Sequence, residues 1–273
     1  MNKKILILGK GFIGERLQGV FGCSISGRMI STFKDAEEEV ERYRPKILLN
    51  CIGFTGAKNV DGCELDKDTT LFANVVVPLI LAEVALRRKV KLVHISSGCI
   101  YHYDYSKDKP VPEDKLPDFF DLYYSRTKIY SERALEILAQ RYGVLLARIR
   151  IPLDDRKHRR NILTKLINFK KVIDIPNSVT YLPDFFKALE HLLKIDANGI
   201  YNIVNKGGLR YPQLMEVYKK YVPGFKYEAI DVKKLNMVRT NLVMSTSKLE
   251  RSGFKIRPIK EVIEECVQNY IKF

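Results

Sequence analysis

The stretch Ile5–Gly14 reads ILILGKGFIG, and the organisation of the chain follows from it. Its first four residues are apolar and end at a glycine, which is typical of a buried strand followed by a sharp turn. The three glycines have the G-x-G-x-x-G spacing, and residues 12–20 have the pattern of a helix. A strand, a glycine turn and a helix in this order predict the first part of a β-α-β unit.

Strand and helix patterns continue to alternate after this first unit. Apolar strands are predicted at residues 23–26, 46–50, 91–95 and 144–151, and helices at residues 33–44, 69–88 and 122–142. Such alternation is typical of parallel strands joined by helical crossovers. We therefore predict an α/β fold with a Rossmann-type, doubly wound parallel sheet, whose ligands bind at the carboxyl ends of the strands.

The sequence changes character after Pro152, where prolines become more frequent and the alternation weakens. Helices are predicted at residues 160–169, 181–194, 211–221 and 259–271, and a strand at residues 200–204. We expect residues 1–152 to form the nucleotide-binding domain. Residues 153–273 are expected to form a smaller substrate-binding lobe that returns some elements to the sheet.

Composition narrows the class of protein. The chain has 273 residues, of which 46% are hydrophobic, so it can bury a sizeable core. We see no run of about 20 uncharged apolar residues, and therefore expect no membrane span. Five cysteines without metal spacing indicate a reduced, cytoplasmic protein. The four histidines show no ligand spacing either, so no metal is expected.

The formal net charge of +15 has two possible explanations. One is an anionic ligand or nucleic acid, and the other is a lysine-rich solvated surface. Basic residues are spread along the chain, and their densest run is residues 156–160 (RKHRR). No zinc spacing or RNA-binding aromatic signature accompanies them, so nucleic acid is not expected as a partner. The positive field would still favour a diphosphate ligand.

The glycine turn has the context of a dinucleotide-binding site. In such a site the first glycine makes the turn, the second lets a pyrophosphate approach, and the third packs the helix on the strand. The free N–H groups at the helix start then bind the phosphates. The candidate contacts here are Gly9, Lys10, Gly11, Phe12, Ile13 and Gly14.

The residue after the second strand favours NADPH over NADH. Sites for NADH usually carry an acidic residue there, whereas this chain has Ser26-Gly27-Arg28. A guanidinium at Arg28 suits the 2′-phosphate of NADPH, and Lys10 could add a second charge. An exposed Arg28 without this role is the alternative. Further candidate cofactor contacts are Asn50, Cys51, Gly53 and Asn74.

Two further motifs lie where catalytic groups are expected. Residues 95–101 (ISSGCIY) end the fourth strand, and residues 123–128 (YYSRTK) open the next helix. Tyr124 and Lys128 are four residues apart and share a helix face, so the ammonium can lower the pKa of the phenol. Tyr124 can then donate a proton to a ketone oxygen that Ser97 also binds. Tyr124 and Lys128 are also candidate cofactor contacts.

Together these residues make the chain resemble the extended short-chain dehydrogenases over nearly its full length. It resembles most the dTDP-4-dehydrorhamnose reductase branch and, within it, the bifunctional 3,5-epimerase/4-reductases that make nucleotide-rhamnose. The more specific segments are residues 98–100 (GCI) and 175–178 (IPNS). Others are residues 53–56, 59–64, 72–76, 124–128, 148–152, 160–165, 172–174, 199–202 and 239–241.

The resemblance implies two steps on one sugar, a UDP- or dTDP-4-keto-6-deoxy-glucose. The family's epimerisation pair falls on Cys99 and Lys165, and hydride from NADPH then reduces C4. Residues 96–97 (SS) replace the family's Ala-Thr, and a serine hydroxyl can do the same work. Residues 239–242 (RTNL) depart from Arg-Ser-Asn-Asn, which weakens the transfer of sugar contacts there. The candidate substrate contacts are Thr55, Asn59, Cys99, Arg160, Asn161, Asn177 and Arg239.

Alternatives stay open at this point. A pure NADPH-dependent 4-keto reductase would lack the epimerisation step, and Cys99 with Lys165 is the feature that separates the two enzymes. A non-catalytic NADP-binding regulatory subunit would be expected to lose the tyrosine or the lysine. The sequence does not separate UDP from dTDP, and a homodimer is an open possibility.

Overall fold

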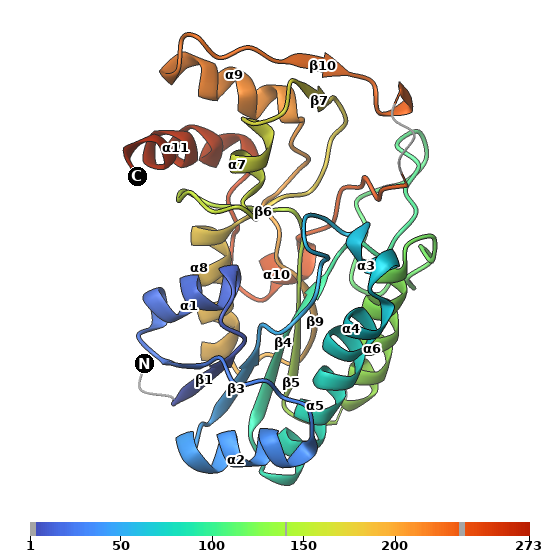
Figure 1. The fold of residues 1–273 in the computed structure, drawn as a ribbon, viewed down its shortest axis with the longest axis vertical. Coiled ribbons are helices and arrows are strands. Elements are labelled where there is room, and N and C mark those ends of the chain that lie inside the picture. Colours follow the sequence, from blue (N-terminus) through green and yellow to red (C-terminus); the bar gives the residue numbers. More distant parts are fainter. Residues whose placement is uncertain (1–3, 140, 235–237) are drawn as a thin grey trace. The chain divides into compact units, whose positions relative to one another are not determined.

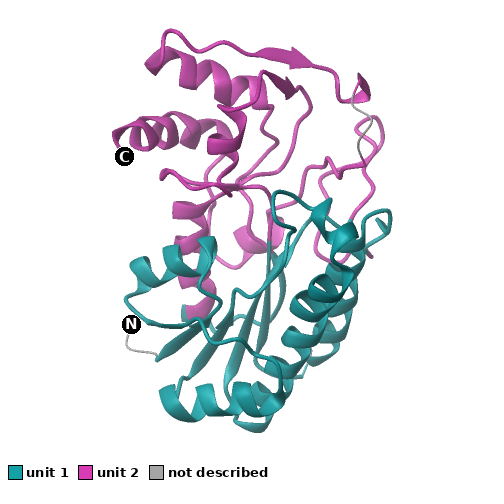
Figure 2. Cartoon of the chain, viewed as in Figure 1, with its two compact units in different colours: residues 1–100, 117–148, 194–201 teal, residues 101–116, 149–193, 202–273 magenta. Residues whose placement is uncertain are grey.

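The computed structural model describes residues 4–139, 141–234 and 238–273 (Figure 1). The chain forms two compact units, each assembled from several segments (Figure 2). Unit 1 comprises residues 1–100, 117–148 and 194–201, and unit 2 comprises residues 101–116, 149–193 and 202–273. The segments of the two units are therefore interleaved along the sequence.

Unit 1 is built around a six-stranded sheet with the order β2-β1-β3-β4-β5-β9. β1 pairs in parallel with both β2 and β3, and β3 pairs in parallel with β4. The predicted α/β class with a parallel Rossmann-type sheet is confirmed. The strands are β1 (Ile5–Leu8), β2 (Ser24–Ser26), β3 (Ile47–Asn50), β4 (Lys91–Ser97), β5 (Val144–Ile149) and β9 (Gly199–Asn202).

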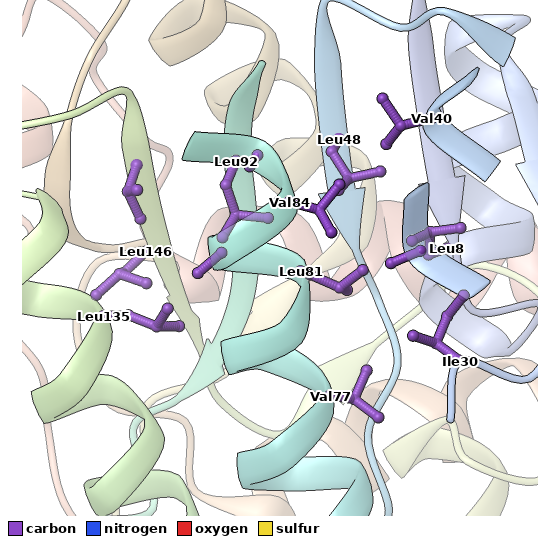
Figure 3. Packing of buried hydrophobic residues seen from close by; sticks show 14 of the residues in the cluster. Leu8, Ile30, Val40, Leu48, Val77, Leu81, Val84, Leu92, Leu135 and Leu146 are labelled. Atoms are coloured by element: carbon purple, nitrogen blue, oxygen red, sulfur yellow. The ribbon is translucent and has the colours of Figure 1, made fainter. Parts of the chain in front are cut away.

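The central strands β1 and β3 are almost entirely apolar, with Asn50 at the end of β3, because both faces of the sheet are covered. Every residue of β1 and β3 is buried, as expected for parallel strands between helix layers. On one face, alternate residues of neighbouring strands form a single cluster with α2 (Phe33–Tyr43), α5 (Val77–Arg87) and α6 (Tyr123–Ala139) (Figure 3). The strands contribute Leu6, Leu8, Leu48, Leu92 and Leu146 to this cluster.

A long helical run crosses that face of the sheet. It consists of α4 (Lys67–Leu71), a π-helical turn η1 (Phe72–Val76) and α5. By length and composition alone this run could span a membrane, a test that core helices also pass. Its buried residues Val77, Leu81 and Val84 pack in the cluster on the sheet, as those of a core helix do.

Two further helices complete unit 1. α1 (Phe12–Phe21) contacts β1 and β2 and ends at Gly22, which has the left-handed conformation that favours glycine. α3 (Gly62–Leu65) is a single short turn that lies against α4 and α6. The predicted helices of unit 1 are confirmed to within a few residues, because their apolar spacing is a local property of the sequence.

Unit 2 has its own core and two small parallel sheets. β6 (Pro152–Leu153) pairs with β8 (Thr180–Tyr181), and β7 (Lys171–Ile173) pairs with β10 (Glu228–Ile230). Its core packs residues of these strands on helices. The helices are α7 (Ile162–Leu166), α8 (Leu182–Lys194), α9 (Tyr211–Tyr221), α10 (Ser247–Arg251) and α11 (Ile259–Lys272), with a 3₁₀ turn η2 (Val232–Lys234).

Unit 2 departs from the sequence predictions in its shortest elements. β6, β7, β8 and β10 have two or three residues each, too few for an alternating pattern to be recognised. The helix predicted at residues 160–169 is shorter, because Asn161 caps it and it ends at Leu166. The strand predicted at residues 200–204 is observed at residues 199–202 as β9, which belongs to the sheet of unit 1.

The hydrophobic core on the sheet predicts that two leucines of α5 contribute very differently to the free energy of unfolding. Leu81 is fully buried, whereas Leu79 is 37% exposed. Leu81→Ala should lower the free energy of unfolding by about 2–5 kcal/mol, because it removes buried methyl groups and leaves a cavity. Leu79→Ala is the matched control and should stay within about 0.5 kcal/mol of the parent chain. Urea unfolding followed by circular dichroism measures both, and equal losses would contradict this packing.

Candidate active site

The glycine turn between β1 and α1 leaves room for a ligand at one of its three glycines. Gly9 has φ +105°, and a Cβ on it would lie 2.7 Å from the Ile52 nitrogen. A Cβ on Gly14 would lie 2.1 Å from the carbonyl oxygen of Gly9. A Cβ on Gly11 would meet no atom within 4 Å. The turn therefore has the cradle that a pyrophosphate requires, open at Gly11 and closed at the other two.

The start of α1 can bind an anion through its backbone. Gly11 is the N-cap residue and supplies no side chain to the first N–H groups of the helix. Such groups and the helix dipole favour a phosphate. Phe12 is buried and Ile13 is half-buried, so both anchor the first turn to the unit.

Lys10 and Arg28 lie on the loops that flank this turn. The Gly9 nitrogen donates to the Ser26 carbonyl (3.2 Å), which joins the glycine turn to the end of β2. The stem of Lys10 lies beside Gly27, since a Cβ there would be 3.5 Å from the Lys10 Cβ. Lys10 is exposed, and its charge is therefore held next to the loop that carries Arg28.

Arg28 is already paired with carboxylates of α2. Its guanidinium lies 2.9 Å from Asp35, 2.7 Å from Glu38 and 3.8 Å from Glu39. Hydrogen bonds from Thr32, Ser31 and Arg28 lower the pKa of Asp35 to about 2, so that carboxylate stays charged. A 2′-phosphate at Arg28 would share the guanidinium with these acids, which sequence reasoning did not anticipate.

Asn50 and Cys51 end β3 with their side chains turned to the interior. Asn50 is fully buried; its Oδ1 accepts from the Ile52 nitrogen (2.9 Å) and its Nδ2 bonds His94 Nδ1 (3.0 Å). Burial raises the pKa of the Cys51 thiol, so the thiol is neutral. These two residues shape the strand end that faces the glycine turn.

The end of β4 carries Ser97, and the first turns of α6 carry Tyr124 and Lys128. Ser125 Oγ donates to the Cys99 carbonyl (2.7 Å), which ties the start of α6 to the segment after β4. Ser97 is 6%, Tyr124 7% and Lys128 4% exposed, so all three are nearly removed from water. Burial strengthens the electrostatic effect of the ammonium on the phenol.

Two opposing effects set the pKa of Lys128. Burial lowers its pKa to about 8, while the nearby Glu132 carboxylate partly offsets that effect. The lysine is therefore mostly protonated at neutral pH and loses its proton as the pH rises through about 8. A cation with this pKa can promote the release of a proton from Tyr124 near physiological pH.

Asn74 holds the loop after β3 against α6. It lies in the π-helical turn η1 and is fully buried. Its Oδ1 accepts from the Phe54 nitrogen (2.8 Å), and its Nδ2 donates to the Phe54 carbonyl (2.9 Å) and to Thr127 Oγ1 (3.2 Å). Both amide hydrogens are thus used within the protein, and π-helical turns often occur at functional sites.

The hydrogen bonds of Asn74 also place Gly53 next to Lys128. A Cβ on Gly53 would lie 3.4 Å from Asn74 Oδ1 and 3.6 Å from Lys128 Nζ. The same loop carries Thr55, which is half-buried, and Asn59, which is exposed and accepts from the Asp61 nitrogen (2.9 Å). The loop after β3 therefore belongs to the same site as α6.

Cys99 lies two residues beyond Ser97 in unit 1. Its backbone nitrogen donates to Ser97 Oγ (3.2 Å), and its side chain is half-buried. The hydroxyl of Ser97 and the thiol thus occupy one short turn. Cys63 is fully buried, and burial raises the pKa of its thiol.

In unit 2, Arg160 precedes α7 and Lys165 lies in the last turn of this helix. Burial and, to a smaller extent, the charge of Arg160 lower the pKa of Lys165. Asn161 is fully buried as the N-cap residue of α7, where its Oδ1 accepts from the Leu163 nitrogen (3.1 Å). Its Nδ2 donates to the carbonyls of Asp154 (2.7 Å) and Arg156 (2.8 Å). Asn161 therefore orders the segment that carries Arg160.

Asn177 is a structural link between two loops of unit 2. It is 1% exposed, and its Oδ1 accepts from Arg150 Nη2 (2.8 Å) and from the Leu242 nitrogen (3.1 Å). Its Nδ2 donates to Asn241 Oδ1 (2.8 Å), and Arg150 Nη1 donates to Thr240 Oγ1 (3.0 Å). These bonds hold the loop that carries Arg239, which is half-buried.

Several buried polar residues at these sites were not predicted from the sequence. Arg150 links the loops of unit 2, while Glu132 and Arg148 form an ion pair (2.6 Å) inside unit 1. The position of Glu132, four residues after Lys128, could have placed it on the same helix face. His94 and Arg148 carried no such signal. Among the described residues, no group of three His, Cys, Asp or Glu could hold a metal ion.

Similarity to known proteins covers nearly the whole chain. Residues 5–179 match the family model described as the RmlD substrate binding domain. The chain is 31% identical to a bifunctional dTDP-4-dehydrorhamnose 3,5-epimerase/dTDP-4-dehydrorhamnose reductase of Arabidopsis thaliana, over 96% of the chain and 91% of that protein.

A second relative is longer. The chain is 32% identical, over 97% of its length, to a trifunctional UDP-glucose 4,6-dehydratase/UDP-4-keto-6-deoxy-D-glucose 3,5-epimerase/UDP-4-keto-L-rhamnose-reductase of Arabidopsis thaliana. It spans 42% of the length of that protein.

Solved structures share the fold. A UDP-rhamnose synthase from Acanthamoeba polyphaga mimivirus superposes with a TM-score of 0.90 at 23% identity, covering 98% of this chain and 100% of that one. A dTDP-4-dehydrorhamnose reductase from Bacillus anthracis, in complex with NADP, gives 0.81 at 17% identity, covering 100% and 99%. The family model and the relatives, each matched along most of the chain, identify the protein as a member of the dTDP-4-dehydrorhamnose reductase family, a branch of the extended short-chain dehydrogenases.

Proposed function

We propose that the protein converts a nucleotide 4-keto-6-deoxy-glucose to the corresponding nucleotide-L-rhamnose, by 3,5-epimerisation and NADPH-dependent reduction of C4. The carrying observation is the buried group of Ser97, Tyr124 and Lys128 at the end of β4 and the start of α6, in the unit that carries the glycine turn. The bifunctional relative, 91% of which the chain covers, supports both steps in a chain of this size. UDP and dTDP are both candidate nucleotides.

The glycine turn and its flanking loops would hold the cofactor in unit 1. The open backbone at Gly11 and the uncapped start of α1 fit a pyrophosphate, and Arg28 with Lys10 fits a 2′-phosphate. Asn50, Cys51, Gly53 and Asn74 shape the strand ends beside it. When bound, the reduced nicotinamide supplies the hydride that C4 accepts.

Reduction needs one proton for each hydride. Tyr124 donates its phenolic proton to the C4 oxygen, which becomes a hydroxyl, and Ser97 donates a hydrogen bond to the same oxygen. The ammonium of Lys128 stabilises the tyrosinate that remains. Solvent then returns the proton to Tyr124.

Epimerisation uses the 4-ketone before it is reduced. The ketone acidifies the hydrogens at C3 and C5, so a base can remove each one and an acid can return it on the opposite face. We assign these roles to Cys99 and Lys165. The lowered pKa of Lys165, caused by burial and Arg160, makes its neutral amine more accessible as a base.

Further side chains are assigned to the substrate. Arg160 and Arg239 can bind the diphosphate, because a guanidinium offers paired donors to phosphate oxygens. Thr55 and Asn59 are assigned to the sugar. The hydrogen bonds of Asn161 and Asn177 are directed to their own loops, so we assign to them the ordering of the segments that carry Arg160 and Arg239.

The decisive experiment follows both steps separately by NMR. With NADPH and UDP-4-keto-6-deoxy-glucose, the product should be UDP-L-rhamnose. Without NADPH, in D₂O, the protein should exchange the C3 and C5 hydrogens for deuterium. Cys99→Ala should lose exchange at one or both centres, while Cys23→Ala is the matched control and should keep it. Reduction without any exchange would identify a pure 4-keto reductase, and inert UDP and dTDP substrates would overturn the proposal.

Tyr124→Phe tests the proton donor. The variant keeps the ring and its packing but cannot donate a proton, so kcat for NADPH oxidation should fall by about 10²–10⁴-fold. Tyr123→Phe, on the neighbouring residue, is the matched control and should retain turnover. Stopped-flow absorbance of NADPH measures both variants, and comparable activity of Tyr124→Phe would remove Tyr124 from this role.

Arg28→Ala tests the preference for NADPH. Losing a guanidinium contact to the 2′-phosphate should raise the KM for NADPH about tenfold, with a smaller change for NADH. Arg42→Ala, at the other end of α2, keeps Arg28 and should change neither constant. Equal effects of Arg28→Ala on the two cofactors would show that Arg28 serves only its three carboxylates.

A further inference from the structure

The buried face of α6 carries a charged residue besides the assigned pair of Tyr124 and Lys128. Tyr124, Lys128 and Glu132 follow one another at intervals of four residues and therefore share one helix face. Glu132 is fully buried, although lysine and glutamate are rarely buried without a partner. A charge at this place requires an explanation beyond helix packing.

Glu132 is fixed from two strands of the sheet. Arg148 on β5 donates from Nε to both carboxylate oxygens (3.0 Å each) and from Nη2 to Oε1 (2.6 Å). Ser96 on β4 donates from Oγ to Oε2 (2.7 Å). Arg148 is 1% and Ser96 2% exposed, so the carboxylate is held rigidly and away from water.

The other groups around Lys128 carry no charge. His94 on β4 is neutral because burial, and then the charge of Lys128, lower its pKa. Cys63 on α3 is a neutral thiol because burial raises its pKa. Asn74 on η1 is an uncharged amide, and α4 and α5 contribute no buried charged side chain. Among the described residues of α3, η1, β4, β5 and α6, Glu132 is therefore the one buried carboxylate, and the two buried cations are Lys128 and Arg148.

We propose that Glu132, anchored by Arg148 and Ser96, is a positioning residue that keeps the ammonium of Lys128 charged beside Tyr124. Its importance for turnover rests on the proposed reductase function, in which Tyr124 is the proton donor. Without the carboxylate, two cations would share one buried layer, and burial would drive the lysine to its neutral amine. Tyr124 would then lose the positive field that stabilises its tyrosinate.

Glu132→Gln removes the charge and preserves the shape of the side chain. NMR of protein labelled with ¹³Cε-lysine reports the protonation of Lys128 directly, and Lys128→Met assigns the signal. In the parent protein the titration midpoint should lie near 8. In Glu132→Gln we expect it to fall by about one unit or more.

Ser96→Ala is the matched control. It removes a hydrogen bond from the same carboxylate but leaves the charges of Lys128, Glu132 and Arg148 in place. The titration midpoint of Lys128 in this variant should therefore equal that of the parent protein. If Glu132→Gln does not fold, judged by circular dichroism, Glu132→Gln with Arg148→Gln removes the unpaired guanidinium as well. Its midpoint should also fall, since the ammonium loses the anion on its own helix. A midpoint equal to or above the parent value, in whichever variant folds, overturns the proposal.

Turnover gives the second readout. The kcat for reduction should decline as the pH rises through the Lys128 midpoint, and in Glu132→Gln this decline should move to lower pH. A shifted midpoint with an unmoved pH profile would overturn the role of Glu132 in turnover. If the parent protein shows no reduction at all, the proposed function fails, while the NMR midpoints still test the link between Glu132 and Lys128.

Discussion

An ion that is removed from water must be paired, and this requirement governs the buried face of α6. Lys128 and Glu132 are buried there, on the side of the sheet where β4 and β5 also carry Leu92 and Leu146. β4 and β5 meet the requirement with Ser96 and Arg148 instead of apolar residues. The sheet thus has an apolar part under α5 and a polar part under the first half of α6. This polar part holds the side chains to which we assign the chemistry.

Backbone proximity imposes a second condition, at the turn after β1 in the same unit. The third glycine of the turn lies so close to the Gly9 carbonyl that any side chain would separate α1 from β1. Only glycine allows this approach, and Gly11 adds no side chain over the start of α1. Asn74 then joins the loop after β3 to α6 with three hydrogen bonds. Ser97 is carried by a strand, and Tyr124 and Lys128 by a helix, and such rigid elements favour exact placement.

Polar side chains of unit 2 serve mainly to order loops. Arg150 donates hydrogen bonds to Thr240 and to Asn177, and thereby joins the loop at Thr240 to the segment before β8. Asn161 caps α7. A buried amide with all its strong bonds inside the protein cannot also bind a sugar without giving one up. The half-buried Arg160, Lys165 and Arg239 are therefore better suited to reach a ligand than the asparagines beside them.

Local patterns in the sequence determined the order of strands and helices, the glycine turn and the spacing of Tyr124 and Lys128. Each of these depends on residues within one turn or one strand, where periodicity and glycine placement are informative. The tertiary structure alone decided the partners of buried polar groups. Glu132 and Arg148 are 16 residues apart, and Arg150 and Thr240 are 90 apart. It also decided the short strands of unit 2, because such contacts arise only when distant segments are brought together and water is excluded between them.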